Sequence, residues 1–198
     1  MKHIENSLSG PGIFTRSVPG LGDFSLSPFN LEQDCHDLHR WVNHERAKYW
    51  QMLNTSVDDV KKAYDELINS RHTDVFTGYF NGKKSFLLER YYPGLTSLKE
   101  HFEVQDSDMG MHVLVAPPER RIPSFTRHIF TTILDFLFSE ERIQRVVVEP
   151  DVRNKKIHRL NKRAGFVYQK QISLPEKDAY LAFCSREHYI SARSGIPD

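Results

Sequence analysis

The chain has 198 residues, of which 39% are hydrophobic and 27% charged, with 27 Lys and Arg against 26 Asp and Glu. This length suits one domain with a real core. The net charge of +1 is too small for a general nucleic-acid binder, which needs an excess of cations to contact phosphates. No apolar run approaches the ~20 residues of a membrane span, and the polar start of the chain lacks a signal-peptide core. Two cysteines are too few for a disulfide scaffold. We therefore expect a cytoplasmic α/β protein with neither a nucleic-acid nor a membrane partner.

Composition divides the chain into three parts. Residues 1–22 are rich in Ser, Gly and Pro without an apolar period, which predicts a mobile leader. Residues 23–190 alternate between strand and helix patterns and form the expected domain. Residues 191–198 are typical of a tail, or of a linker to a further domain such as a fused synthetase.

The first half of the domain contains two helix patterns and one hairpin. The turn Asn81-Gly82 between two apolar runs is the strongest short signal for a β-hairpin. Ser56 precedes a helical period with an acidic residue at the third position, which is typical of a helix start. The expected elements are a strand at 24–26, helices at 34–42 and 57–68, and hairpin strands at 75–80 and 84–92.

The second half follows the order β-α-β-α-β-β. Three consecutive valines at 146–148 indicate a strand that is covered on both faces, and Pro150 ends it. Gly165 is a typical helix C-terminal glycine. The expected elements are strands at 110–115, 145–149, 166–173 and 180–185, with helices at 125–138 and 154–163. This order predicts a mixed, partly parallel sheet of six to seven strands with flanking helices.

One segment carries a family resemblance. Pro150-Asp-Val-Arg-Asn154, a helix, and then Ala164-Gly-Phe166 resemble the GNAT superfamily of N-acetyltransferases. The resemblance implies two parallel strands that splay apart and bind the amide-rich pantetheine arm of coenzyme A (CoA) as a pseudo-strand. It also implies a helix N-terminus that offers N–H groups to the pyrophosphate.

Four separated segments narrow the resemblance. Residues 41–52, 110–118, 147–154 and 174–177 are similar to siderophore-biosynthesis acyltransferases of the desferrioxamine and alcaligin type. This resemblance implies an acyl-CoA-dependent N-acyltransferase that converts N-hydroxycadaverine or N-hydroxyputrescine to a hydroxamate for iron acquisition. The donor is either acetyl-CoA or succinyl-CoA. The partners are a small N-hydroxyamine and a fused or separate siderophore synthetase, and the transfer step needs no metal.

His112 and Asp151 are the catalytic pair that the resemblance implies. A hydroxylamine nitrogen is less basic than an alkylamine, so the enzyme needs orientation and a base to collect the proton as the adduct forms. Histidine is suited to that role near neutral pH. Asp151 either fixes the tautomer of the histidine or orients the N–OH group. Purely structural roles are the alternatives: a core histidine, and an aspartate that caps the following helix.

The expected CoA site departs from the superfamily pattern at residues 119–126, which contain no glycine. Arginine side chains compensate with charge, because guanidinium groups pair well with phosphate. Asn154 either contacts the pantetheine or only caps its helix. The expected cofactor-binding residues are Val113, Val115, Arg120, Arg121, Ser124, Phe125, Thr126 and Asn154.

The expected acceptor site combines aromatic lining with one acid. An aliphatic diamine needs apolar walls and a carboxylate for its distal ammonium. Glu89 is the candidate carboxylate, with a solvated surface residue as the alternative. The remaining candidates are His39, Trp41, Trp50 and Gln51. The spacing of His36 and His39 also fits a zinc ligand pair, but an amphipathic helix explains it better, and we expect no metal.

Two other functions stay open. One is an acetyltransferase of a different amine. The other is a non-catalytic CoA-binding module, which the glycine-free segment 119–126 favours and the presence of His112 and Asp151 opposes.

Overall fold

The computed structural model describes residues 13–70 and 72–194, and within them one mixed sheet of eight strands organises the chain. The strand order is β1-β2-β3-β4-β5-β6-β8-β7. The strands are β1 (Phe14–Val18), β2 (Gly22–Pro28), β3 (Thr73–Phe80), β4 (Lys83–Tyr91), β5 (Asp108–Val115), β6 (Arg145–Val148), β7 (Val167–Ser173) and β8 (Asp178–Ser185). The α-helices are α1 (Leu31–Val42), α2 (Val57–Ile68), α3 (Phe125–Ser139), α4 (Lys155–Arg163) and α5 (Arg186–Ser194), and the short 3-10 helices are η1 (Glu45–Trp50), η2 (Pro93–Leu95) and η3 (Ser97–Glu100).

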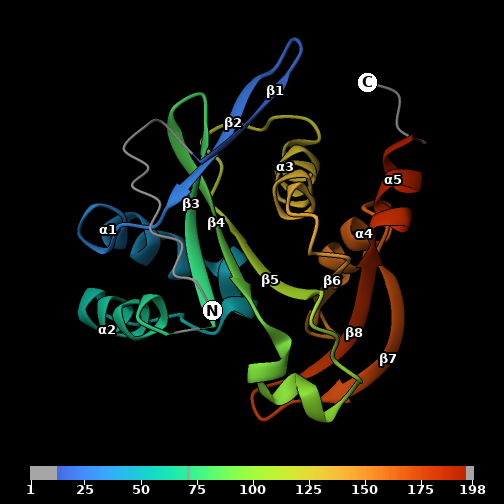
Figure 1. Cartoon of the computed structure of the whole chain (residues 1–198). Coiled ribbons are helices and arrows are strands. Elements are labelled where there is room, and N and C mark those ends of the chain that lie inside the picture. Colours follow the sequence, from blue (N-terminus) through green and yellow to red (C-terminus); the bar gives the residue numbers. More distant parts are fainter. Residues whose placement is uncertain (1–12, 71, 195–198) are drawn as a thin grey trace.

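Helices cover both faces of the β3–β5 half of the sheet. Because side chains alternate along a strand, neighbouring leucines of β4 enter different cores. Leu87 packs in the cluster with α1 and α2, whereas Leu88 packs in the cluster with α3. Figure 1 shows α1 and α2 on one side of this half, with α3 on the other. Strand β4 is therefore buried on both faces. The same holds for β6, as its valine run predicts, since Val146 and Val148 pack in one cluster and Val147 in another.

The local signals in the sequence are confirmed. Asn81 and Gly82 have φ values of 47° and 75°, the left-handed pair that a tight hairpin turn requires. Ser56 and Asp59 form a complete capping box at the start of α2. The β-α-β-α-β-β order of the second half is also confirmed.

Strands β5 and β6 pair in parallel over only three residues and then part. Asp108, Met109 and Gly110 are opposite Arg145 to Val147, and no further pairs follow. From Met111 onward β5 is paired only with β4. The predicted splayed strand pair is therefore present, and it leaves the facing edges of β5 and β6 available to a ligand (Figure 1).

Two predictions about the ends of the chain are wrong where the structure describes them. Part of the expected leader forms β1, which pairs with β2, and Ile13 N–H donates to the carbonyl of Leu26 at 2.7 Å. This additional strand raises the sheet from the expected six to seven strands to eight. Residues 191–194 complete α5 instead of beginning a tail. Residues 1–12 and 195–198 lie outside the described range.

Among the described helices, none combines the length and apolar character of a bilayer span.

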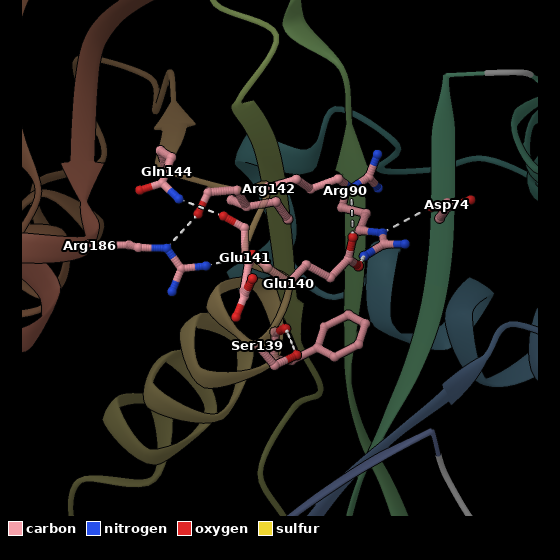
Figure 2. A network of polar contacts seen from close by, with 10 residues as sticks. Asp74, Arg90, Ser139, Glu140, Glu141, Arg142, Gln144 and Arg186 are labelled. Carbon is pink, nitrogen blue, oxygen red and sulfur yellow. Dashed lines mark hydrogen bonds and ion pairs between the residues drawn. The ribbon is translucent and has the colours of Figure 1, made fainter. Parts of the chain in front are cut away.

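Arg90 ties the end of α3 to the sheet. Its guanidinium forms ion pairs with Glu140, which follows α3, and with Asp74 of β3, where Nε and Oδ2 are 2.9 Å apart. It also lies over the rings of Phe76 and Phe136. Figure 2 shows this network, in which Arg142 approaches the same Glu140 carboxylate from the solvent side. Because the Arg90 side chain is only 14% exposed, its pairs are less screened by water than surface pairs.

We expect Arg90→Ala to lower the free energy of unfolding by about 2 kcal/mol, because it leaves Glu140 without its buried partner and removes the ring contacts. Arg142→Ala is the matched control, since Arg142 pairs with the same carboxylate but is 68% exposed. We expect that variant to change stability by less than about 0.5 kcal/mol. Urea unfolding measures both, and equal losses would contradict the assignment.

Candidate active site

A cleft of about 1600 Å³ opens where β5 and β6 part. It is lined by η1 and α2 on one side, by β4, β5 and the residues after β6 at its base, and by α4 and the start of α3 on the other side. The lining contains both charged groups and aromatic rings, as expected for a small-molecule site.

His112 lies at the base of the cleft between two carboxylates. Its Nδ1 is 3.1 Å from Oε2 of Glu89, and its Nε2 is 2.5 Å from Oε1 of Glu149. Glu89 is directly opposite His112 in the β4–β5 register, so both side chains project from the same face. Glu149 follows the last residue of β6. The side chain of His112 is 40% exposed, whereas those of Glu89 and Glu149 are 11% and 5% exposed.

Hydroxyl groups and a lysine satisfy the remaining carboxylate oxygens. Tyr64 donates to Oε1 of Glu89 at 2.6 Å and itself accepts from the indole N–H of Trp50 at 3.2 Å. Tyr91 donates to Oε2 of Glu149 at 2.7 Å, and Nζ of Lys177 is 3.5 Å from Oε1 of Glu149. Each oxygen of the two carboxylates therefore has a donor, and the imidazole is fixed in position.

Gly110 makes room for one of these donors. The ring of Tyr91 crosses β5 so closely that a Cβ on residue 110 would lie 2.3 Å from ring carbons. Tyr91 and Gly110 are opposite each other in the strand register. A glycine at this position is therefore what lets the Tyr91 hydroxyl reach Glu149.

The two carboxylates set the charge of His112. Burial opposes the charged imidazole, but Glu149 and Glu89 outweigh it and raise the pKa of His112 from 6.5 to about 10. Burial likewise opposes a charged Glu149, but the cationic His112 lowers the pKa of Glu149 to about 2. The ring is thus an imidazolium at neutral pH, which differs from the neutral base that the sequence predicts.

Asp151 lines the cleft but does not contact His112. Its carboxylate accepts from Nε and Nη2 of Arg153, at 2.9 and 2.6 Å. These hydrogen bonds hold the pKa of Asp151 below its usual range. The partner of His112 on this side is Glu149, two residues earlier, so the predicted tautomer-fixing role of Asp151 is wrong for this structure.

The acceptor-site predictions are only partly met. Trp41, Trp50, Gln51 and Glu89 line the cleft. Glu89 is only 11% exposed and already accepts one hydrogen bond from Tyr64 and one from His112, so it is not the solvated surface residue of the alternative interpretation. His39 is not among the lining residues, and its Nε2 is 3.1 Å from the carbonyl of Thr55.

Most of the predicted CoA residues lie along one side of the cleft. Those that line it are Val113, Val115, Arg120, Arg121, Phe125, Thr126 and Asn154. Ser124 is not a lining residue and takes a left-handed φ of 56° just before α3. The N–H of Phe125 donates to the carbonyl of Ile122 at 3.3 Å, so it is not free for a phosphate. Asn154 caps α4 by accepting from Ile157 N–H at 3.4 Å, and it also lines the cleft.

Sequence reasoning missed four residues of the site: Tyr64, Tyr91, Glu149 and Lys177. Glu149 and Lys177 stand inside the motif segments 147–154 and 174–177, which was the available signal. Tyr91 is two residues after Glu89 on one strand and so shares its face.

Neither cysteine is placed to act as a nucleophile. Cys35 and Cys184 are buried, and neither belongs to the cleft lining. Burial raises the pKa of Cys184 to about 12 and also raises the pKa of Cys35. Among the described residues, no group of three or more His, Cys, Asp or Glu side chains is arranged to hold a metal ion.

The mixed sheet splays apart beside a helix N-terminus, and the cleft with its charged and aromatic lining opens at that splay, an arrangement typical of acyltransferases that bind CoA. A family model for the GNAT acetyltransferase domain matches residues 30–174. The chain therefore belongs to the GNAT acetyltransferase family.

Several relatives of the chain are named for hydroxylated amines. The chain is 26% identical over 160 residues to an N(6)-hydroxylysine O-acetyltransferase of Escherichia coli, with 80% of this chain and 50% of that protein covered. It is 23% identical over 167 residues to an N-hydroxyputrescine acetyltransferase of Acinetobacter baumannii, with 84% of this chain and 79% of that protein covered. The chain thus spans about half the length of the Escherichia coli relative.

Solved structures share the fold. An uncharacterised protein of Bacillus halodurans superposes with a TM-score of 0.84 at 25% identity, over 93% of this chain and 96% of that one. An aminoglycoside acetyltransferase in complex with coenzyme A superposes with a TM-score of 0.76 at 17% identity, over 86% and 99%.

The charge state of His112 is directly measurable. We expect the ring nitrogens to stay protonated through neutral pH and to titrate near 10, because two carboxylates stabilise the cation. In Glu149→Gln the closest carboxylate is lost, so the pKa of His112 should fall well below 10. Nitrogen-15 NMR of histidine-labelled protein measures both, with the exposed His36 of α1 as the internal reference. A wild-type titration near 6.5 would contradict the charged state.

Proposed function

We propose that this protein transfers an acetyl or succinyl group from acyl-CoA to the hydroxylated nitrogen of a diamine, N-hydroxycadaverine or N-hydroxyputrescine, and so forms a hydroxamate. The relatives named for N-hydroxyputrescine and hydroxylysine support the class of acceptor. The four motif segments of the siderophore acyltransferases support a place in siderophore biosynthesis, with a fused or separate synthetase as partner.

One observation carries the proposal: His112 is held between the carboxylates of Glu89 and Glu149, which raise its pKa to about 10. An alkylamine with a pKa near ~10 is an ammonium at neutral pH and must lose a proton before it can attack. Neither an imidazolium nor a carboxylate as acidic as Glu149 is a strong enough base for that step. The site therefore suits a nucleophile that is already neutral, and a hydroxylamine nitrogen is one.

The His112–Glu149 pair then serves as the proton carrier in the transfer. The substrate nitrogen attacks the thioester carbonyl, and a C–N bond forms as the C–S bond breaks. Glu149 takes the proton that the nitrogen loses, and His112 gives its Nε2 proton to the departing sulfur. A proton passed from Glu149 to His112 across their 2.5 Å contact restores the starting state. No acyl-enzyme forms in this scheme, which agrees with the burial of both cysteines.

Asp151 orients the acceptor. Its carboxylate stays ionised because Arg153 pairs with it, and it lines the same cleft as His112. An ionised carboxylate accepts a strong hydrogen bond from the O–H of an N–OH group. A plain amine in its neutral form has only weaker N–H donors.

The donor lies on the side of the cleft formed by β5, α3 and α4. Its pantetheine arm extends along the free edge of β5 at Val113 and Val115, where β6 has turned away. Its phosphates are held by Arg120, Arg121 and the N–H of Thr126 at the start of α3. The ion pair between Lys83 and Glu119 lies at the same end of the cleft.

A different amine is the second candidate acceptor, because aminoglycoside and spermidine acetyltransferases share the fold, with TM-scores of 0.76 and 0.65. A CoA-binding module without turnover is the third possibility, since residues 119–126 lack glycine.

Release of CoA thiol separates these functions. We expect release with N-hydroxycadaverine or N-hydroxyputrescine to exceed release with cadaverine by at least ~100-fold at pH 7, because the parent amine is almost wholly charged. Acetyl-CoA and succinyl-CoA are compared in parallel, and their ratio identifies the product. Equal rates with cadaverine would point to an ordinary amine acetyltransferase, and CoA binding without turnover to the module.

The pH profile tests the role of His112. We expect kcat/KM to persist above neutral pH and to fall near pH 10, where His112 loses its proton. His112→Ala should lower kcat by ~100-fold or more and remove that alkaline limb. His36→Ala is the matched control on the exposed face of α1 and should change neither. A rate that instead climbs steadily from pH 7 to 10 would mean that His112 acts as a neutral base.

A further inference from the structure

Asn161 presents a buried polar atom without a partner. The residue is 1% exposed on α4, and among the described residues its Oδ1 has no hydrogen-bond donor. A buried amide oxygen without a donor destabilises the folded protein, so such an atom usually has a partner from water or a ligand. Asn161 belongs to the lining of the cleft.

A chain of hydrogen bonds explains why this atom is an acceptor. The carbonyl of Val152 can only accept, so Nε2 of His158, 3.3 Å away, is assigned as its donor. Nδ1 of His158 then accepts from the hydroxyl of Tyr168 at 2.8 Å. The oxygen of Tyr168 in turn accepts from Nδ2 of Asn161 at 3.3 Å. This order of donors and acceptors fixes the orientation of the Asn161 side-chain amide, so that Nδ2 faces Tyr168 and Oδ1 points away from it.

The position of Asn161 on α4 indicates what supplies the missing donor. Asn154, Ile157 and Asn161 are spaced so that they share one helix face, and all three line the cleft. Asn154 and Asn161 are two turns apart, about 10 Å along the axis. Asn154 uses its Oδ1 to cap the helix, so its Nδ2 remains as a donor. The face thus offers a donor, an apolar contact and an acceptor in sequence.

We propose that Asn161 is a binding residue for the donor substrate, and that its Oδ1 accepts a hydrogen bond from an amide N–H of the pantetheine arm. The arm contains two amides joined by methylene groups, so it brings a carbonyl for Asn154, carbon for Ile157 and an N–H for Asn161. This inference rests on the proposed use of acyl-CoA. It does not depend on the identity of the acceptor amine.

Calorimetric binding of two ligands tests the assignment. Free CoA contains the arm, whereas adenosine 3′,5′-bisphosphate has the nucleotide without it. We expect Asn161→Leu to weaken CoA about tenfold and to leave the bisphosphate unchanged. Tyr168→Phe should weaken CoA about threefold, because the amide loses the partner that orients it. Gln169→Leu is the matched control, an exposed amide on β7 that touches none of these groups.

The outcomes separate this inference from the proposed function. If the wild-type protein binds CoA and both variants bind it equally well, a water molecule satisfies Oδ1 and the assignment is wrong. Equal weakening of both ligands would indicate a general distortion of α4, and would also overturn it. If Asn161→Leu does not fold, the unchanged or weakened affinity of Tyr168→Phe decides. A wild-type protein that binds no CoA at all would refute the proposed acyl-CoA donor itself.

Discussion

Strands β5 and β6 stay together for three residue pairs and then separate, and the candidate site exists because of that separation. Two parallel strands that remained paired would place Glu149 inside the ladder, with no space for a ligand above His112. Pro150 follows Glu149 and lacks an N–H, so it cannot continue the pairing in that direction. The helices that follow the two strands, α3 and α4, begin on the same side of the resulting gap, and their first turns line it. The fold therefore produces both an open strand edge and a ring of polar groups at one place.

The two carboxylates and the imidazolium at the base of this gap lose solvation by burial, and the surrounding side chains compensate for that loss. Two carboxylates with little exposure would repel each other and would be poorly solvated, and an imidazolium between them compensates for both effects. Tyr64 and Tyr91 supply hydroxyl donors to the outer oxygens, so each oxygen of the two carboxylates has at least one donor within the protein. The arrangement resists deprotonation of the histidine, which is the opposite of what a base that must work on an ammonium would need. The electrostatics thus bear on the choice of substrate as much as on the mechanism.

Local patterns in the sequence were sufficient for most of the fold and for part of the site. The hairpin turn at Asn81-Gly82, the cap at Ser56 and the valine run of β6 each specify structure within a few residues. Strand β1 was missed because its short, half-exposed stretch lies among Ser, Gly and Pro and gains its stability only by pairing with β2. His112 was found, but its true partner was not, because Glu149 reaches it only across the splayed strands. No local pattern in the sequence distinguishes Glu149 from Asp151 as the partner of His112. The direction of the chain after β6 determines which of the two carboxylates reaches the imidazole.

The two sides of the cleft follow one physical rule. A ligand group is recognised where the protein has left a polar atom unsatisfied, and is excluded where the protein has satisfied it internally. Glu89 is closer to the second class, since each of its oxygens already accepts one hydrogen bond, from Tyr64 or from His112, and its negative charge acts on His112. Asn161 falls in the first class, because the hydrogen bonds that orient its amide leave Oδ1 open. The exposed edge of β5 belongs with it, since β6 has withdrawn from the backbone groups there. The proposed recognition of an amide-bearing arm on one side and of a neutral nucleophile on the other would thus depend on which polar groups the fold completes and which it leaves open.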